Sequence, residues 1–207
     1  MKLIQKFLAV MMVLFAAAAF AQSEGEVQYT TLNPPQPTST GNKIEVLEFF
    51  FYGCIHCYNL HPALSAWEKT MPRDVQLDFV PVAFNAQWEQ MVYTFYALSA
   101  MGKRKQLDDA LYEAWHNRVA LYSLDQIADF VAQNGVNRKE FVDNYNSFSV
   151  QSSAKQTKQM LRTYQIEGTP TLIVDGKYVI SGLEPEDAIR VLDQLIKKAR
   201  KEHGRRR

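Results

Sequence analysis

The sequence predicts an α/β fold in which an all-helical insertion interrupts a small sheet. Three observations lead to this prediction. An apolar strand, a helix and a second strand follow one another between residues 44 and 82, which is the order of two parallel strands joined by a crossover helix. Helical periodicity then continues from about residue 86 to residue 165. Strand signals return at 170–181, and an amphipathic helix follows them.

Composition limits the classes of protein to consider. The chain has 207 residues, of which 47% are hydrophobic, so it can bury a core without disulfide support. It has 23 basic and 22 acidic residues. Without Lys2 and Lys6 the balance is 21 to 22, a net charge of −1. This balance argues against a nucleic-acid partner and against a general membrane-binding role.

The first 21 residues differ from the rest of the chain. Lys2 and Lys6 precede an apolar run at 7–18, and Ala19-Phe20-Ala21 places small residues two positions apart. This pattern is typical of a secretory signal peptide that is cleaved between Ala21 and Gln22. An uncleaved anchor is the alternative, but the run is shorter than the ~20 residues of a membrane-spanning helix. We therefore expect a mature chain that works outside the cytoplasm.

The first half of the predicted sheet begins after a β-prone segment at 27–32 and a proline-rich linker. Residues 44–52 are apolar except for two glutamates, as expected of a central strand that is covered on both faces. A helix is expected over 54–69, where Pro62 removes one backbone hydrogen bond and should kink it. A strand is expected over 75–82.

The helical insertion and the second half of the sheet are predicted from the same periodicities. Ser123 with Gln126 forms a capping box, and Asn134-Gly135 is typical of a helix end. Asp175-Gly176 has the chemistry of a type I′ hairpin turn. The helices expected between residues 86 and 165 are 88–101, 107–116, 124–134, 138–145 and 152–164; the hairpin strands are 170–174 and 178–181, and the last helix is 185–201. The predicted division is a signal peptide at 1–21, a first sheet segment at 22–85, the insertion at 86–150 and a second sheet segment at 151–207.

The two cysteines, Cys54 and Cys57, indicate redox chemistry. A bridge that closes so small a loop adds little stability, so chemistry explains the pair better. Cys54 begins a helix, where unpaired backbone N–H groups favour a thiolate. We predict that Cys54 is the nucleophile and Cys57 the resolving thiol. His56 is expected to stabilise negative charge at Cys54 and so to make the disulfide more oxidising; the alternative is a solvated helix histidine.

Two segments carry a resemblance to a known family. The stretch from Glu48 to Tyr58, an apolar strand that continues into Cys-x-His-Cys, resembles the active-site segment of the DsbA family. Gly168-Thr169-Pro170-Thr171, followed by Asp175-Gly176-Lys177-Tyr178, resembles the second signature of that family. The helical block falls where the family has its insertion. The resemblance covers essentially the whole mature chain and implies a thioredoxin-like sheet with an inserted all-helical subdomain.

The resemblance also implies roles for individual residues. Cys54 and Cys57 form a redox-active disulfide that needs no bound cofactor. Pro170 has a cis peptide bond that faces the disulfide and presents the backbone of Thr169 to a substrate strand; an ordinary trans proline is the alternative. Glu48 is a buried acid that takes part in proton transfer at Cys57, although residues 78–81 offer it no lysine partner; the alternative is an exposed carboxylate.

The function implied is that of a periplasmic dithiol oxidase. It would donate its disulfide to unfolded or partly folded exported proteins with free cysteines, act as a monomer, and be reoxidised by a DsbB-like membrane quinone reductase. Ile55 departs from the family, because well-known members have proline at this position, and the residues between the cysteines tune the redox potential.

Three other functions compete with this interpretation. A periplasmic reductase or isomerase uses the same fold in the opposite direction, but isomerases have an N-terminal dimerisation domain for which about 20 mature residues leave no room. A metal could be bound by Cys54, Cys57, His56 and His61. A structural zinc site needs a second spaced pair of ligands, so no metal is predicted. An interaction protein with a merely structural bridge is the third alternative.

Overall fold

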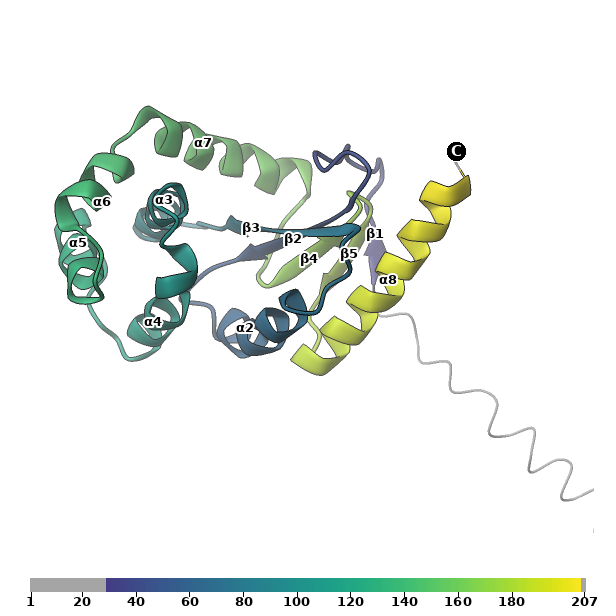
Figure 1. Cartoon of the computed structure of the whole chain (residues 1–207), viewed down its shortest axis with the longest axis horizontal. Coiled ribbons are helices and arrows are strands. Elements are labelled where there is room, and N and C mark those ends of the chain that lie inside the picture. The colour runs from purple at the N-terminus through teal and green to yellow at the C-terminus, as the bar shows by residue number, and fades with distance from the viewer. Residues whose placement is uncertain (1–28, 206–207) are drawn as a thin grey trace, which may run out of the picture.

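The computed structural model describes residues 29–205, in which a five-stranded mixed sheet carries a block of helices at one end (Figure 1). The strand order is β1-β5-β4-β2-β3. The predicted signal peptide lies outside the described residues. In this part of the chain, every helix is too short or too polar to serve as a membrane-spanning segment.

The elements follow the predicted order. The strands are β1 (Thr30–Thr31), β2 (Ile44–Phe50), β3 (Val75–Pro81), β4 (Thr171–Val174) and β5 (Tyr178–Ser181). The helices are α2 (Ile55–Glu68), α3 (Ala86–Ala100), α4 (Arg104–His116), α5 (Leu124–Gln133), α6 (Arg138–Tyr145), α7 (Phe148–Thr163) and α8 (Pro185–Arg205). The described part of the β-prone segment 27–32 is a two-residue strand, and helices α3, α4, α7 and α8 extend beyond the predicted ranges.

Strand β2 is central, as its unbroken apolar pattern predicts. It pairs in parallel with β3 and antiparallel with β4, and each of its seven residues is buried. Helices α2 and α8 cover one face of the sheet and α7 lies over the other (Figure 1). The sheet is therefore sandwiched between helical layers, which explains why β2 tolerates so few polar side chains.

Local signals in the sequence account for most helix boundaries. Asn85, Ser123, Asn137 and Ser147 each accept a hydrogen bond from the backbone N–H three residues on, as good N-caps do. The hairpin turn between β4 and β5 has positive φ at Asp175 and Gly176, 55° and 62°, as a type I′ turn requires. The predicted turn and the predicted cap at Ser123 are confirmed.

The helical block is joined to the sheet by a shared core and by α7. Phe50, Phe51 and Tyr52, at the end of β2, belong to the same buried cluster as Leu111 and Phe141 of the block. Helix α7 packs against α3 while its C-terminal end reaches the sheet (Figure 1).

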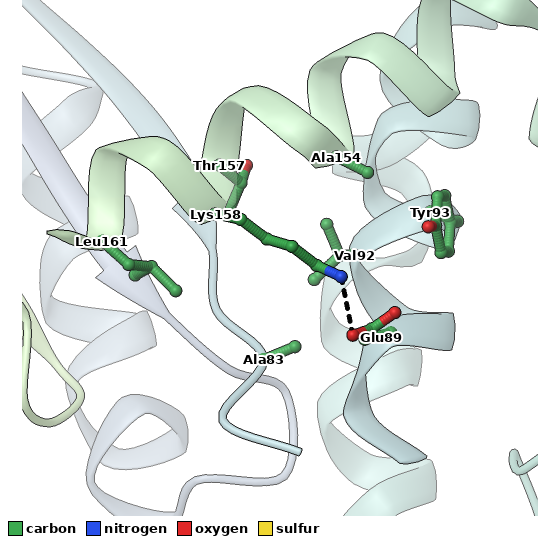
Figure 2. A pocket seen from close by; sticks show the side chains of 8 residues that line it. All are labelled: Ala83, Glu89, Val92, Tyr93, Ala154, Thr157, Lys158 and Leu161. Carbon is green, nitrogen blue, oxygen red and sulfur yellow. Dashed lines mark hydrogen bonds and ion pairs between the residues drawn. The ribbon is translucent and has the colours of Figure 1, made fainter. Parts of the chain in front are cut away.

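The seam between α3 and α7 encloses a small cavity of about 10 Å³, which Figure 2 shows from close by. Lys158 of α7 pairs with Glu89 of α3 at 2.8 Å, and Val92 lies beside this pair. The space is enough for about one water molecule, so this seam is packed rather than open.

Candidate active site

The cysteine pair lies where β2 gives way to α2. Cys54 is the N-cap residue of α2, with φ −84° and ψ 119°, and no side chain caps the helix there. The N–H groups of the first turn therefore remain available, and those of His56 and Cys57 help to lower the pKa of the Cys54 thiol. Cys57 is buried within the first turn, whereas Cys54 is half-buried.

Gly53 allows the aromatic wall of the site to come close. A Cβ atom at this position would lie 2.5 Å from Cε1 of Phe51 and 3.0 Å from Cε3 of Trp115, which is closer than real side chains pack. Trp115, on α4, also contacts the Phe51 ring, with centroids 5.1 Å apart. The turn before Cys54 is therefore fitted against the helical block.

The two thiols have opposite acid strengths. The pKa of Cys54 is lowered from 9.0 to about 5. The largest cause is a hydrogen bond from the Cys57 thiol, and Thr169 and the first-turn N–H groups also lower it, against the effect of burial. Burial raises the pKa of Cys57 far above its ordinary value, and the Cys54 and Glu48 charges add to this. At neutral pH, Cys54 is a thiolate and Cys57 is a thiol.

The loop before β4 faces the cysteines. The peptide bond between Thr169 and Pro170 is cis, as the resemblance implied. The Cys54 sulfur lies 3.2 Å from the carbonyl oxygen of Thr169. Residues 168–170 precede the first sheet pair of β4, which joins Phe49 to Thr171. The structure therefore brings Thr169 and Pro170 together with Cys54, although they are distant in sequence.

Glu48 is a buried residue with 1% of its surface exposed, so the alternative of an exposed carboxylate does not hold. Its pKa is raised from 4.5 to about 8, chiefly by burial and next by the charge of the neighbouring Asp108. Among the described residues, its Oε1 atom has no hydrogen-bond partner. Glu48 is thus largely protonated at neutral pH, and its charge, when it ionises, raises the pKa of Cys57.

His56 is exposed, and its backbone N–H is among the groups that lower the pKa of the Cys54 thiol. His61, which the metal-binding alternative also used, pairs with Asp109 at 2.8 Å. Between residues 29 and 205, no three His, Cys, Asp or Glu side chains are grouped as metal ligands.

Sequence reasoning missed the polar residues that α4 contributes. Arg104 and Asp108 form an ion pair at 2.7 Å, and the Tyr52 hydroxyl donates to Asp108 at 2.6 Å. The four-residue spacing of Arg104 and Asp108 on a helix was the available signal. Nothing in the sequence showed that this face of the helix lies near Glu48.

An acidic thiol at a helix N-terminus, next to a buried and weakly acidic partner thiol, defines a thiol–disulfide oxidoreductase. The model of the DSBA-like thioredoxin domain matches residues 45–192. The thiol:disulfide interchange protein DsbA of Bordetella parapertussis is 39% identical over 193 residues, with 91% of each chain covered. The chain belongs to the DsbA-like thioredoxin family.

Solved structures agree with this assignment. The crystal structure of Pseudomonas aeruginosa DsbA superimposes with a TM-score of 0.81 at 35% identity, and covers 84% of this chain and 93% of its own. The oxidoreductase NmDsbA1 from Neisseria meningitidis gives a TM-score of 0.79 at 29% identity, with 87% and 95% covered. The predicted fold class, a thioredoxin-like sheet with a helical insertion, and the predicted enzyme class are confirmed.

Proposed function

We propose that this protein is a dithiol oxidase that donates its Cys54–Cys57 disulfide to exported proteins. The observation that carries the proposal is the stabilised Cys54 thiolate: the Cys57 thiol and two backbone N–H groups hold negative charge on its sulfur. These contacts stabilise the reduced form and not the disulfide. A more stable reduced form makes the disulfide a stronger oxidant, because about 30 mV of potential corresponds to ~1.4 kcal/mol.

The proposed reaction begins when a substrate thiolate attacks the Cys54 sulfur. The bond between Cys54 and Cys57 breaks, Cys57 takes a proton, and a mixed disulfide with the substrate remains at Cys54. A second substrate thiolate then attacks the substrate sulfur, and Cys54 leaves as a thiolate. The substrate dithiol is oxidised and the protein disulfide is reduced, with Glu48 positioned to supply the proton to Cys57.

The substrate is proposed to lie along the loop at Thr169 and Pro170. A cavity of about 450 Å³ adjoins this loop, which is space for an extended peptide segment. Exposed apolar side chains lie near the cysteines; Ile55 and Tyr58 on α2 are 49% and 37% exposed, and Tyr122, which contacts Trp115, is 48% exposed. This surface suits unfolded chains with free cysteines better than a folded partner.

We further propose where the protein acts and how its cysteines are reoxidised. The protein would act as a periplasmic monomer after cleavage between Ala21 and Gln22, without a bound cofactor. A DsbB-like membrane quinone reductase would reoxidise the reduced pair, because each turnover leaves both electrons on Cys54 and Cys57.

The test is the equilibrium of the Cys54–Cys57 disulfide with glutathione, measured by alkylating free thiols in the mature chain from Gln22. A potential well above the thioredoxin level of about −270 mV is expected. A value at or below that level would overturn the oxidase and favour a reductase. The Cys57→Ser variant is the control, because it cannot form the internal disulfide and should report only mixed disulfides at Cys54.

A further inference from the structure

The sheet gives Glu48 no counter-charge. Its register neighbours on the two adjacent strands are Phe79 of β3 and Leu172 of β4, both apolar. One carboxyl oxygen has no hydrogen-bond partner among the described residues. A buried carboxyl in such surroundings remains protonated unless another element supplies positive charge.

Helix α4 supplies that charge. The guanidinium carbon of Arg104 lies 4.3 Å from the centroid of the Phe79 ring, and Phe79 is the direct neighbour of Glu48 in the sheet. Asp108, one turn later on α4, holds the guanidinium through its Oδ2 atom at 2.7 Å, and its Oδ1 atom accepts from Tyr52 at 2.6 Å. Arg104 is thus fixed above the neighbour of Glu48.

The titratable groups around Glu48 come from three elements. Helix α2 contributes Cys54 and Cys57, and β2 contributes Tyr52. Helix α4 contributes Arg104, Asp108 and Tyr112. Burial raises the pKa of both carboxyl groups, and Asp108 raises that of Glu48 further; Arg104 lowers the pKa of Glu48 and of Asp108 against these effects.

The Arg104–Asp108 pair also borders solvent. Arg104, Asp108 and Tyr112 line a cavity of about 910 Å³ between α2 and α4. The side chains of Arg104 and Asp108 are 15% and 8% exposed. The arginine can therefore remain hydrated at one edge while its charge acts on the buried carboxyl.

We propose that Arg104, held in place by Asp108, is a positioning residue that sets the protonation of Glu48 and thereby the proton supply to the Cys57 sulfur. This inference rests on the proposed function. When the disulfide is attacked, Cys57 leaves with an electron pair, the Glu48 carboxyl gives up its proton, and a Cys57 thiol and a Glu48 carboxylate result. Arg104 stabilises that carboxylate, so it favours the transfer without touching the sulfur.

The test is a titration of the Glu48 carboxyl by carbon-13 NMR in the oxidised protein, where neither cysteine ionises. In Arg104→Met, the pKa of Glu48 is expected to rise by at least about one pH unit, because an opposite charge is lost. Arg104→Lys should restore most of the original value. An unchanged or lowered pKa in Arg104→Met would overturn the proposal; damage that merely admits water to the site would lower it.

Arg104→Gln gives an independent test should Arg104→Met fail to fold. Its amide nitrogen can still donate to Asp108 while the positive charge is lost, so the pKa of Glu48 should again rise. An unchanged or lowered pKa of Glu48 in this variant would overturn the proposal. Arg138→Met is the matched control, because Arg138 pairs with Asp125 and Asp129 far along the helical block, and it should leave Glu48 unchanged.

A kinetic measurement separates positioning from simple structural support. The rate at which reduced glutathione opens the disulfide, corrected for the glutathione thiolate fraction, should fall with pH as Glu48 loses its proton. In Arg104→Met the midpoint of this fall should move to higher pH, and a fixed midpoint would contradict the proposal. The NMR titration needs no substrate, so its outcome is independent of the glutathione equilibrium that tests the oxidase function.

Discussion

Thr169 lies directly beside the Cys54 sulfur. Its backbone carbonyl lies 3.2 Å from the sulfur and accepts from the thiol, while its side-chain contact lowers the pKa of Cys54 and so favours the thiolate. The two residues are 115 positions apart, so the loop before β4 completes a site that β2 and α2 begin.

The low pKa of Cys54 makes the stability of the reduced protein depend on pH. Its folded value of about 5 lies below the ordinary value of 9.0, so the contribution to stability is fully present above pH 9 and is lost as the pH falls through 5. We expect the reduced protein to lose its stability advantage over the oxidised protein between pH 9 and pH 5. Urea denaturation of both forms measures this; the oxidised form is the control, since it has no Cys54 thiol. A constant difference would contradict the assignment of the thiolate to Cys54.

Alkylation should distinguish the two cysteines. At neutral pH, Cys54 in the Cys57→Ser variant should react with iodoacetamide at least about 100-fold faster than Cys57 in Cys54→Ser, because only Cys54 is both a thiolate and accessible. Stopped-flow or mass-spectrometric rates provide the measurement. Comparable rates in the two variants would show that Cys57 is neither buried nor weakly acidic in solution.

Gly53→Ala should destabilise the protein by about 1–3 kcal/mol, the usual cost of overpacking. The added methyl group would meet the rings of Phe51 and Trp115, which are held by neighbouring aromatic side chains. Gly168→Ala is the matched control, because a Cβ atom there meets nothing within 4 Å; its free energy of unfolding should stay within about 0.5 kcal/mol of the wild type. Urea denaturation compares the two variants. Equal free energies of unfolding for Gly53→Ala and Gly168→Ala would refute the close approach of Trp115.

The seam between α3 and α7 should depend on the hydrogen bond between Thr157 and Tyr96 more than on the ion pair that Figure 2 shows. Thr157→Val deprives the partly buried Tyr96 hydroxyl of its partner at 2.6 Å, at a cost of about 1–3 kcal/mol. Lys158→Met removes a pair whose side chains are 50% and 33% exposed, at a cost below about 1 kcal/mol. Thermal unfolding in low and high salt compares the stability of the two variants. A larger loss of stability in Lys158→Met than in Thr157→Val would contradict this prediction.

The sequence was sufficient to predict the elements that depend on local patterns. The apolar run at β2, the cap at Ser123 and the Asp175-Gly176 turn each depend on neighbouring residues, and all three are present. The cysteine pair could be placed at a helix start for the same reason, and the family resemblance located Thr169 and Pro170.

The surroundings of Glu48 could not be predicted in this way. Arg104 and Asp108 reach it only because α4 packs across the end of β2, which depends on the tertiary arrangement. His56 illustrates the same limit, since the motif identifies the residue but not that its backbone N–H acts on the Cys54 thiol.

Phe50, Phe51 and Tyr52 have a consequence for how the chain is made. These rings are buried against helices that are synthesised later, chiefly α3 and α4. During synthesis, the end of β2 emerges long before its cover exists, so the nascent chain presents an aromatic, β-prone segment to its surroundings. This thiol–disulfide oxidoreductase is therefore itself, for part of its synthesis, a chain that needs protection from aggregation.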